Sequence, residues 1–203
     1  MKLRKKCRIC YGTLKKIISF NKISLVGDFS KRKTNKTKYP ISLNFCKKCK
    51  HIQIAEIIKP EKLFSKYLWQ TGVSKTNILL FDDLIKGYEN KINSNTKVLE
   101  VASNDGSFLN YLDKKFNNFI VGIDPAKNLQ KRNKNLIQIP GFFNFSESKK
   151  ILEKFGKFDF IFARNVVAHV SNPNEIFSGI KNIIKNDGYA IIEVPHLLPI
   201  LKN

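Results

Sequence analysis

The feature that most constrains this chain is a strand, turn and strand pattern between residues 98 and 125. The segment VLEVASNDGSFL, residues 98–109, begins with a short apolar run and continues into small and turn-forming residues. The segment VGIDP, residues 121–125, is a second apolar run, and it ends in the acid Asp124. In an open α/β sheet, a carboxylate at this spacing can accept both ribose hydroxyls of a nucleoside in the crevice beyond the strand ends. The pattern therefore predicts a Rossmann-like nucleoside site.

The composition of the turn favours S-adenosylmethionine over a dinucleotide as the bound nucleoside. A dinucleotide site requires G-x-G-x-x-G, which seats a pyrophosphate on a helix N-terminus. The turn here reads E-V-A-S-N-D-G and fits the E-x-G-x-G-x-G cofactor pattern loosely. Each segment alone could be an ordinary turn, so the prediction depends on their order and spacing. The candidate cofactor-binding residues of the two segments are Glu100, Ala102, Ser103, Asn104, Asp105, Gly106, Asp124 and Pro125.

Apolar runs and helical periodicities alternate along the rest of the chain. The expected strands lie near 97–102, 119–124, 135–139, 157–163 and 189–194. The expected helices lie near 61–72, 74–90, 107–116, 126–133, 146–154 and 173–185, with Ser74 as a candidate N-cap. Repeated strand and helix units predict an α/β fold with a doubly wound parallel sheet. We expect a zinc-binding domain over 1–58, a helical connector over 59–92 and a Rossmann-like methyltransferase domain over 93–203.

The four cysteines form two C-x-x-C pairs. They are Cys7, Cys10, Cys46 and Cys49. Each pair can place two thiolates on one ion from a single turn, and two such turns make a tetrahedral zinc site. The connecting residues, 11–45, exceed the spacing of a compact zinc ribbon, but closure entropy grows slowly with loop length. Four thiolates leave no open position, so the zinc would be structural. Disulfides are the alternative, and His51 could replace one ligand.

The formal net charge is +21, from 37 Lys and Arg against 16 Asp and Glu, and such a charge can serve a nucleic-acid partner. The lysines are scattered, however, and the one concentrated tract, KRKTNKTK at 31–38, fits a solvated loop. We therefore expect no nucleic-acid partner. No stretch is long enough to cross a membrane, and MKLRKK runs into CRIC without an apolar segment of signal-peptide length. We expect a cytoplasmic protein.

The segment RNVVAHV, residues 164–170, follows the fourth expected strand at the carboxyl end of the sheet, where ligands bind. It contains no D/N-P-P-Y/F sequence, the device with which amino-group methyltransferases grip a nitrogen. His169 is the candidate base, because imidazole can take a proton near neutral pH. A structural role for this histidine is the alternative.

With these motifs, the chain resembles the S-adenosylmethionine-dependent sugar C-methyltransferases, which act on nucleotide-linked keto-deoxyhexoses and carry an N-terminal zinc-binding domain. The resemblance covers essentially the whole chain. It also rests on LFSKYLWQTGVS at 63–74, VGIDPAKNL at 121–129, GFF at 141–143 and GYAIIEVP at 188–195. It implies that a base removes a proton beside the sugar ketone and that the resulting enolate carbon attacks the donor methyl.

The resemblance assigns expected roles to particular residues. The turn from Glu100 to Gly106, together with Asp124, would contact the cofactor. Either Phe142 or Phe143 would lie by the adenine. Asn165 and His169 would border the reaction centre, and Tyr67 or Trp69 would face the sugar, which makes Tyr67 a second candidate catalytic residue.

Members of the family continue past the fifth strand into a Y-H-E-H-like segment with catalytic residues, whereas this sequence stops at Asn203. We therefore expect a sheet truncated after its fifth strand and either a fragment, a split gene product or a separate C-terminal polypeptide as partner. The competing functions are a zinc-anchored RNA-binding module and an RNA methyltransferase. Donor binding separates the enzymes from the module, and a salt-sensitive RNA shift would favour RNA.

Overall fold

The computed structural model describes residues 2–25, 37–129 and 135–196. The chain divides into two compact units. The first comprises Met1–Leu68 with Ser171–Asn174, and the second comprises Trp69–Val170 with Glu175–Asn203. The expected connector over 59–92 contributes residues to both units, which meet between Leu68 and Trp69. Most of the basic tract, residues 31–36, lies outside the described residues.

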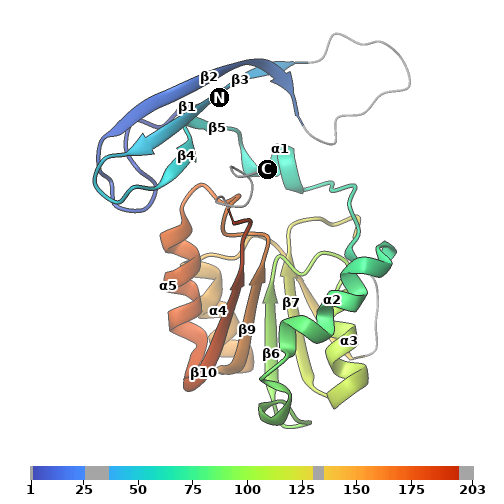
Figure 1. The fold of residues 1–203 in the computed structure, drawn as a ribbon. Coiled ribbons are helices and arrows are strands. Elements are labelled where there is room, and N and C mark those ends of the chain that lie inside the picture. Colours follow the sequence, from blue (N-terminus) through green and yellow to red (C-terminus); the bar gives the residue numbers. More distant parts are fainter. Residues whose placement is uncertain (1, 26–36, 130–134, 197–203) are drawn as a thin grey trace. The chain divides into compact units, whose positions relative to one another are not determined.

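The first unit is built from short antiparallel strands (Figure 1). Strands β1 (Lys2–Leu3) and β5 (Glu56–Ile57) pair with each other. Strands β2 (Leu14–Ser24), β3 (Lys38–Cys46) and β4 (Ile52–Ile54) form a sheet in that order. Helix α1 (Pro60–Phe64) begins at a proline, whose fixed φ suits a first helical turn. The sequence-based helix over 61–72 is wrong beyond residue 64.

The described part of the second unit contains a five-stranded parallel sheet in the order β10-β9-β6-β7-β8. Its strands are β6 (Lys97–Val101), β7 (Phe119–Asp124), β8 (Leu136–Pro140), β9 (Phe158–Arg164) and β10 (Ile184–Glu193). The predicted parallel, Rossmann-like sheet is confirmed. Strand β10 begins five residues earlier than the expected 189, with a register shift between Ile184 and Tyr189.

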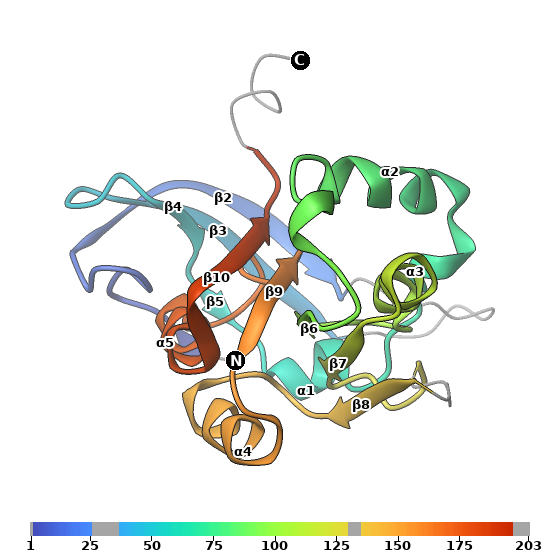
Figure 2. The same ribbon diagram turned by 90° about the horizontal axis from the view of Figure 1, so that it is seen from below.

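Two helices cover each face of this sheet (Figure 2). The helices are α2 (Lys75–Ile85), α3 (Ser107–Phe116), α4 (Phe145–Phe155) and α5 (Pro173–Ile183), and the 3-10 turns η1 (Thr71–Val73) and η2 (Glu89–Lys91) flank α2. One core cluster joins α2 and α3 to the sheet, and the other joins α4 and α5 to its opposite face. Both faces are buried, which explains why the strands read as nearly continuous apolar runs. In the part of the chain that the structure describes, no helix has the length and apolarity to cross a bilayer.

The ends of α2 follow from local chemistry. The Ser74 Oγ accepts a hydrogen bond from the Asn77 N–H at 3.3 Å, so the predicted N-cap is confirmed. The helix ends at Ile85 and not near 90, because Gly87 follows with a φ of 86°, a conformation that breaks the helix. Of the expected helix over 126–133, residues 127–129 form a turn and residues 130–134 lie outside the description.

Candidate cofactor site and metal centre

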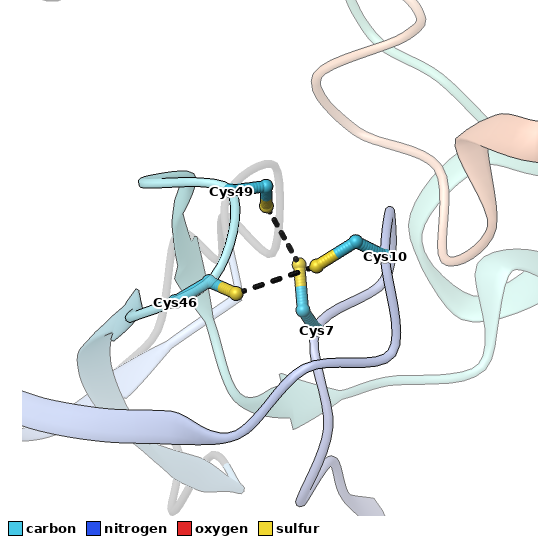
Figure 3. A group of neighbouring side chains, drawn as sticks. All are labelled: Cys7, Cys10, Cys46 and Cys49. Atoms are coloured by element: carbon cyan, nitrogen blue, oxygen red, sulfur yellow. Dashed lines mark hydrogen bonds between the residues drawn. The ribbon is translucent and has the colours of Figure 1, made fainter.

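The four cysteine sulfurs of the first unit converge on one point (Figure 3). All four Sγ atoms lie within 4.8 Å of one another, with Cys7 and Cys49 at 3.6 Å and Cys10 and Cys46 at 3.5 Å. A tetrahedral zinc with bonds of about 2.3 Å to sulfur separates its ligands by about 3.8 Å. A disulfide would need about 2.05 Å, and all four thiols are free. The donor set therefore fits a structural zinc ion.

The two C-x-x-C turns share one backbone conformation. The N–H of Tyr11 bonds the Cys7 carbonyl at 3.1 Å, and the N–H of Lys50 bonds the Cys46 carbonyl at 2.9 Å. Tyr11 and Lys50 both adopt a left-handed φ, 58° and 63°. Hydrogen bonds, the largest from the backbone N–H of Cys49, lower the pKa of the Cys46 thiol to about 6. At the Cys49 thiol, the backbone N–H of His51 is outweighed by the neighbouring thiols and burial, which raise the pKa to about 12. Among the described residues, the cluster consists of cysteines, and His51 supports it by accepting the Cys46 N–H through its carbonyl.

The turn from Glu100 to Gly106 in the second unit, which we call the cofactor turn, contains three residues with a left-handed backbone conformation. Ala102, Asn104 and Gly106 have φ values of 57°, 54° and 74°. These are the three positions at which the E-x-G-x-G-x-G pattern places glycine. Gly106 is also the N-cap of α3, and a Cβ there would lie 2.3 Å from the Leu136 side chain. The turn thus has the glycine-type conformation that close approach to a ligand requires, with only one glycine.

Asp124 joins the two halves of the motif. It ends β7, is only 7% exposed, and accepts the Asn104 N–H at 2.8 Å and the Ala126 N–H at 2.7 Å. Burial raises the pKa of Asp124, and the two backbone donors oppose that shift. These two backbone donors fix the orientation of the carboxylate. Pro125, the next residue, is half-buried.

Side chains of the cofactor turn also hold residues 69–73, a segment that we call the strap. The Asn104 Oδ1 accepts the Thr71 N–H at 2.9 Å, and its Nδ2 donates to the Trp69 carbonyl at 3.1 Å. The Asp105 Oδ2 accepts the Gly72 N–H at 3.1 Å. These bonds explain why the expected helix over 61–72 does not form. They also give the Asn104 and Asp105 side chains a role that the sequence did not indicate.

Gly72 leaves no room for a side chain, which gives a testable prediction. A Cβ there would lie 2.3 Å from the Ser107 Oγ and 3.0 Å from the Asp105 Oδ2. We expect Gly72→Ala to displace the strap and lower the free energy of unfolding by about 1–3 kcal/mol, measured by urea titration. Val73→Ala, at a side chain 69% exposed, is the matched control and should stay within about 0.5 kcal/mol. Equal free energies of unfolding for the two variants would show that the strap does not depend on the missing side chain of Gly72.

A charge network with a buried carboxyl group, Glu100, and a partly exposed one, Glu193, lies at the carboxyl ends of β6, β9 and β10. Glu100 is 4% exposed, and its Oε1 lies 3.4 Å from the Arg164 guanidinium. Arg164 also lies 3.3 Å from Glu193, which accepts the Asn165 Nδ2 at 2.6 Å. Burial raises the pKa of Glu100 to about 8, although Arg164 acts in the opposite direction. Sequence reasoning missed Arg164 and Glu193; the available signal was a charged residue at the end of each apolar run.

The remaining candidate residues lie in different surroundings. His169 is exposed in the turn after β9, where its backbone N–H donates to the Val166 carbonyl at 2.9 Å. Phe143 is only 7% exposed and packs into the core, so Phe142, which is half-buried, is the better placed of the two for a ligand. Tyr67 is 37% exposed and belongs to the first unit.

The cofactor turn has polar atoms that fit a bound ligand. Among the described residues, the Glu100 Oε2, the Ser103 Oγ and the Gln138 Oε1 are buried and make no hydrogen bond. Gln138 reaches the Asn104 carbonyl through its other amide atom at 3.5 Å, so it borders the turn. Buried polar atoms are normally paired. The amino-acid and ribose groups of S-adenosylmethionine carry the donors that such atoms require.

Comparison with known proteins identifies the family. Residues 75–200 match the family model of a methyltransferase domain. The chain belongs to this methyltransferase family. Residues 7–64 match a second model, described as "Putative zinc binding domain". These matches confirm the predictions of a methyltransferase domain and of an N-terminal zinc-binding domain.

Individual proteins are similar to this chain over different parts of their length. The C-methyltransferase NovU of Streptomyces niveus is 25% identical over 205 residues, which cover 97% of this chain and 49% of NovU. The chain thus spans about half the length of this relative. A SAM-dependent methyltransferase of Geobacter sulfurreducens, solved with S-adenosyl-L-homocysteine, is 11% identical with a TM-score of 0.46 and covers 66% of this chain and 55% of that one. A SAM-dependent methyltransferase of Anabaena variabilis is 14% identical with a TM-score of 0.44, over 52% and 46% of the two chains.

Proposed function

We propose that this methyltransferase transfers a methyl group from S-adenosylmethionine to a carbon of a nucleotide-linked keto-deoxysugar. The observation that supports it most directly is the cofactor turn, closed by Asp124 at the carboxyl edge of a parallel sheet. The similarity to NovU, a C-methyltransferase, supports carbon as the acceptor atom. We also propose that catalysis uses sequence equivalent to the part of NovU that this chain does not cover, joined to this chain or supplied as a separate polypeptide.

The proposed reaction requires a base and a fixed geometry. A base removes the proton from the carbon beside the ketone, and the electron pair is delocalised onto the ketone oxygen. That carbon then attacks the donor methyl in line, the bond from sulfur to methyl breaks, and S-adenosylhomocysteine leaves. Glu100 and the turn to Gly106 would line the amino-acid end of the donor, and Asp124 would hold its ribose. His169 and Asn165 are the proposed acceptor-side residues.

Methyl transfer with isotopically labelled donor tests the acceptor class. Nucleotide-linked 4-keto sugars and RNA are offered in parallel, because the net charge of +21 favours an RNA methyltransferase as the second candidate. Label in the sugar, bound to carbon, supports the proposal. Label in RNA, or donor-independent RNA binding that falls steeply with salt, would replace it with one of the RNA functions.

Asp124→Ala tests the donor site itself. Loss of a charged hydrogen-bonding partner should weaken binding of S-adenosylhomocysteine by about 10-fold to 100-fold, or about 1.5–3 kcal/mol, in calorimetry. Asp187→Ala removes an exposed carboxylate of β10 and should leave the affinity unchanged. Wild-type affinity in a folded Asp124→Ala variant would place the nucleoside elsewhere.

A further inference from the structure

Arg164 bridges the two strands on either side of its own. It ends β9, which lies between β6 and β10 in the sheet. One guanidinium nitrogen, Nη1, lies 3.4 Å from the Glu100 Oε1 on the β6 side, and Nε lies 3.3 Å from the Glu193 Oε2 on the β10 side. Arg164 and Glu193 are also direct register partners. The Arg164 side chain thus connects Glu100, in the candidate donor site, to Glu193, which accepts a hydrogen bond from the Asn165 side chain.

Two aromatic rings fix the Arg164 side chain. Its guanidinium carbon lies 4.7 Å from the centre of the Phe108 ring and 5.1 Å from that of Phe81. Only 13% of the side chain is exposed. A guanidinium is planar and remains charged at all relevant pH values, so this geometry suits arginine better than lysine. The cation is held in place before any ligand binds.

Glu100 depends on this cation. Its surroundings contain three further carboxylates, Asp124, Asp105 and Glu193, and each disfavours ionisation of Glu100. Burial acts in the same direction and is the largest cause of its raised pKa, near 8, whereas Arg164 opposes it. The Glu100 Oε2 has no hydrogen-bond partner among the described residues. The carboxyl group is therefore poised between the neutral and charged forms, and one of its oxygens lacks a hydrogen-bond partner in the described part of the chain.

We propose, on the basis of the donor site proposed above, that Arg164 is a positioning residue that favours the ionised form of Glu100 and orients its carboxylate to accept the α-ammonium group of the methyl donor. The ammonium group is a cation, so it binds a carboxylate far better than a neutral carboxyl group. Without Arg164, four carboxylates would share the site, and Glu100 would retain its proton to higher pH. Arg164 acts through Glu100 and need not touch the donor.

Calorimetry of the full chain with S-adenosylhomocysteine between pH 6.5 and 9 tests this role. Ionisation of Glu100 should strengthen binding as the pH rises through its pKa, whereas the ligand's own amino group, with an ordinary pKa of about 7.7–8.0, weakens binding over the same range. Glu100→Gln retains only the ligand's contribution and serves as the reference. Arg164→Gln should bind about 10-fold more weakly at pH 7.5 and shift the Glu100-dependent rise to higher pH. Arg164→Lys should restore part of both properties.

The possible outcomes are distinct. A folded Arg164→Gln variant with wild-type affinity and pH profile would overturn the role of Arg164 while leaving the donor site intact. Failure of the wild-type chain to bind S-adenosylhomocysteine at any pH would overturn the donor site and this role with it. If circular dichroism shows that Arg164→Gln is unfolded, Glu193→Gln decides. Removal of that neighbouring carboxylate should shift the rise to lower pH, and an unchanged or opposite shift would contradict the proposal.

Discussion

Removal of zinc with a chelator is expected to unfold the first unit, with a loss of folding free energy on the order of 10 kcal/mol. The physical reason is the small core of this unit. Within its described residues, the buried hydrophobic positions are Cys7, Cys46 and Ala55, so two of the three are themselves candidate ligands. Strand β2 has no buried residue along its length. The metal would thus supply the cohesion that an apolar core gives elsewhere.

Metal analysis under reducing conditions, combined with far-ultraviolet circular dichroism, measures this effect. One zinc per chain is expected, and loss of the metal should remove the β signal of the first unit. Cys46→Ser should resemble the chelated protein, whereas Lys47→Ser, an exposed neighbour in the same turn, should retain both metal and fold. A zinc-free chain with an intact first unit, or two disulfides in place of the thiols, would show that the cluster is not a metal site.

Replacement of His169 by alanine is expected to lower methyl transfer by about 100-fold, the usual cost of losing an acid-base group. The side chain is exposed in the turn after β9, and the turn is held by a backbone bond to Val166, so the substitution should not disturb the fold. The affinity for S-adenosylhomocysteine should therefore remain within about twofold of wild type. A selective loss of rate identifies a group that acts on the acceptor.

The assay needs protein that transfers labelled methyl groups, with sequence equivalent to the uncovered part of NovU present in cis or in trans. His196→Ala is the matched control, because His196 is also an exposed histidine, in the segment that follows β10. Equal rates for wild type and His169→Ala would assign proton removal to another group. A loss confined to His196→Ala would move that role to the segment after β10.

Local patterns predicted the sheet and the metal ligands. The α3 helix over 107–116 matches its expected bounds, because Gly106 and the apolar spacing mark its start and its buried face. The strap was not predictable in this way. Its backbone bonds to Asn104 and Asp105 join residues 33 positions apart, and such tertiary bonds override local helical periodicity. The same holds for Arg164 and Glu100, which meet only because β9 lies beside β6.

The left-handed backbone at Ala102 and Asn104 affects which sequence patterns detect a methyltransferase turn of this kind and which substitutions the turn permits. A pattern that demands three glycines would reject this chain, although its backbone adopts glycine-type φ angles at all three positions. Asparagine tolerates such angles comparatively well, whereas alanine accepts a cost of about 1–2 kcal/mol. Glycine could therefore replace Ala102 without steric penalty, whereas any β-branched residue at this position would be strongly disfavoured. The permitted exchanges at this turn are determined by its torsion angles and not by the residue names in a motif.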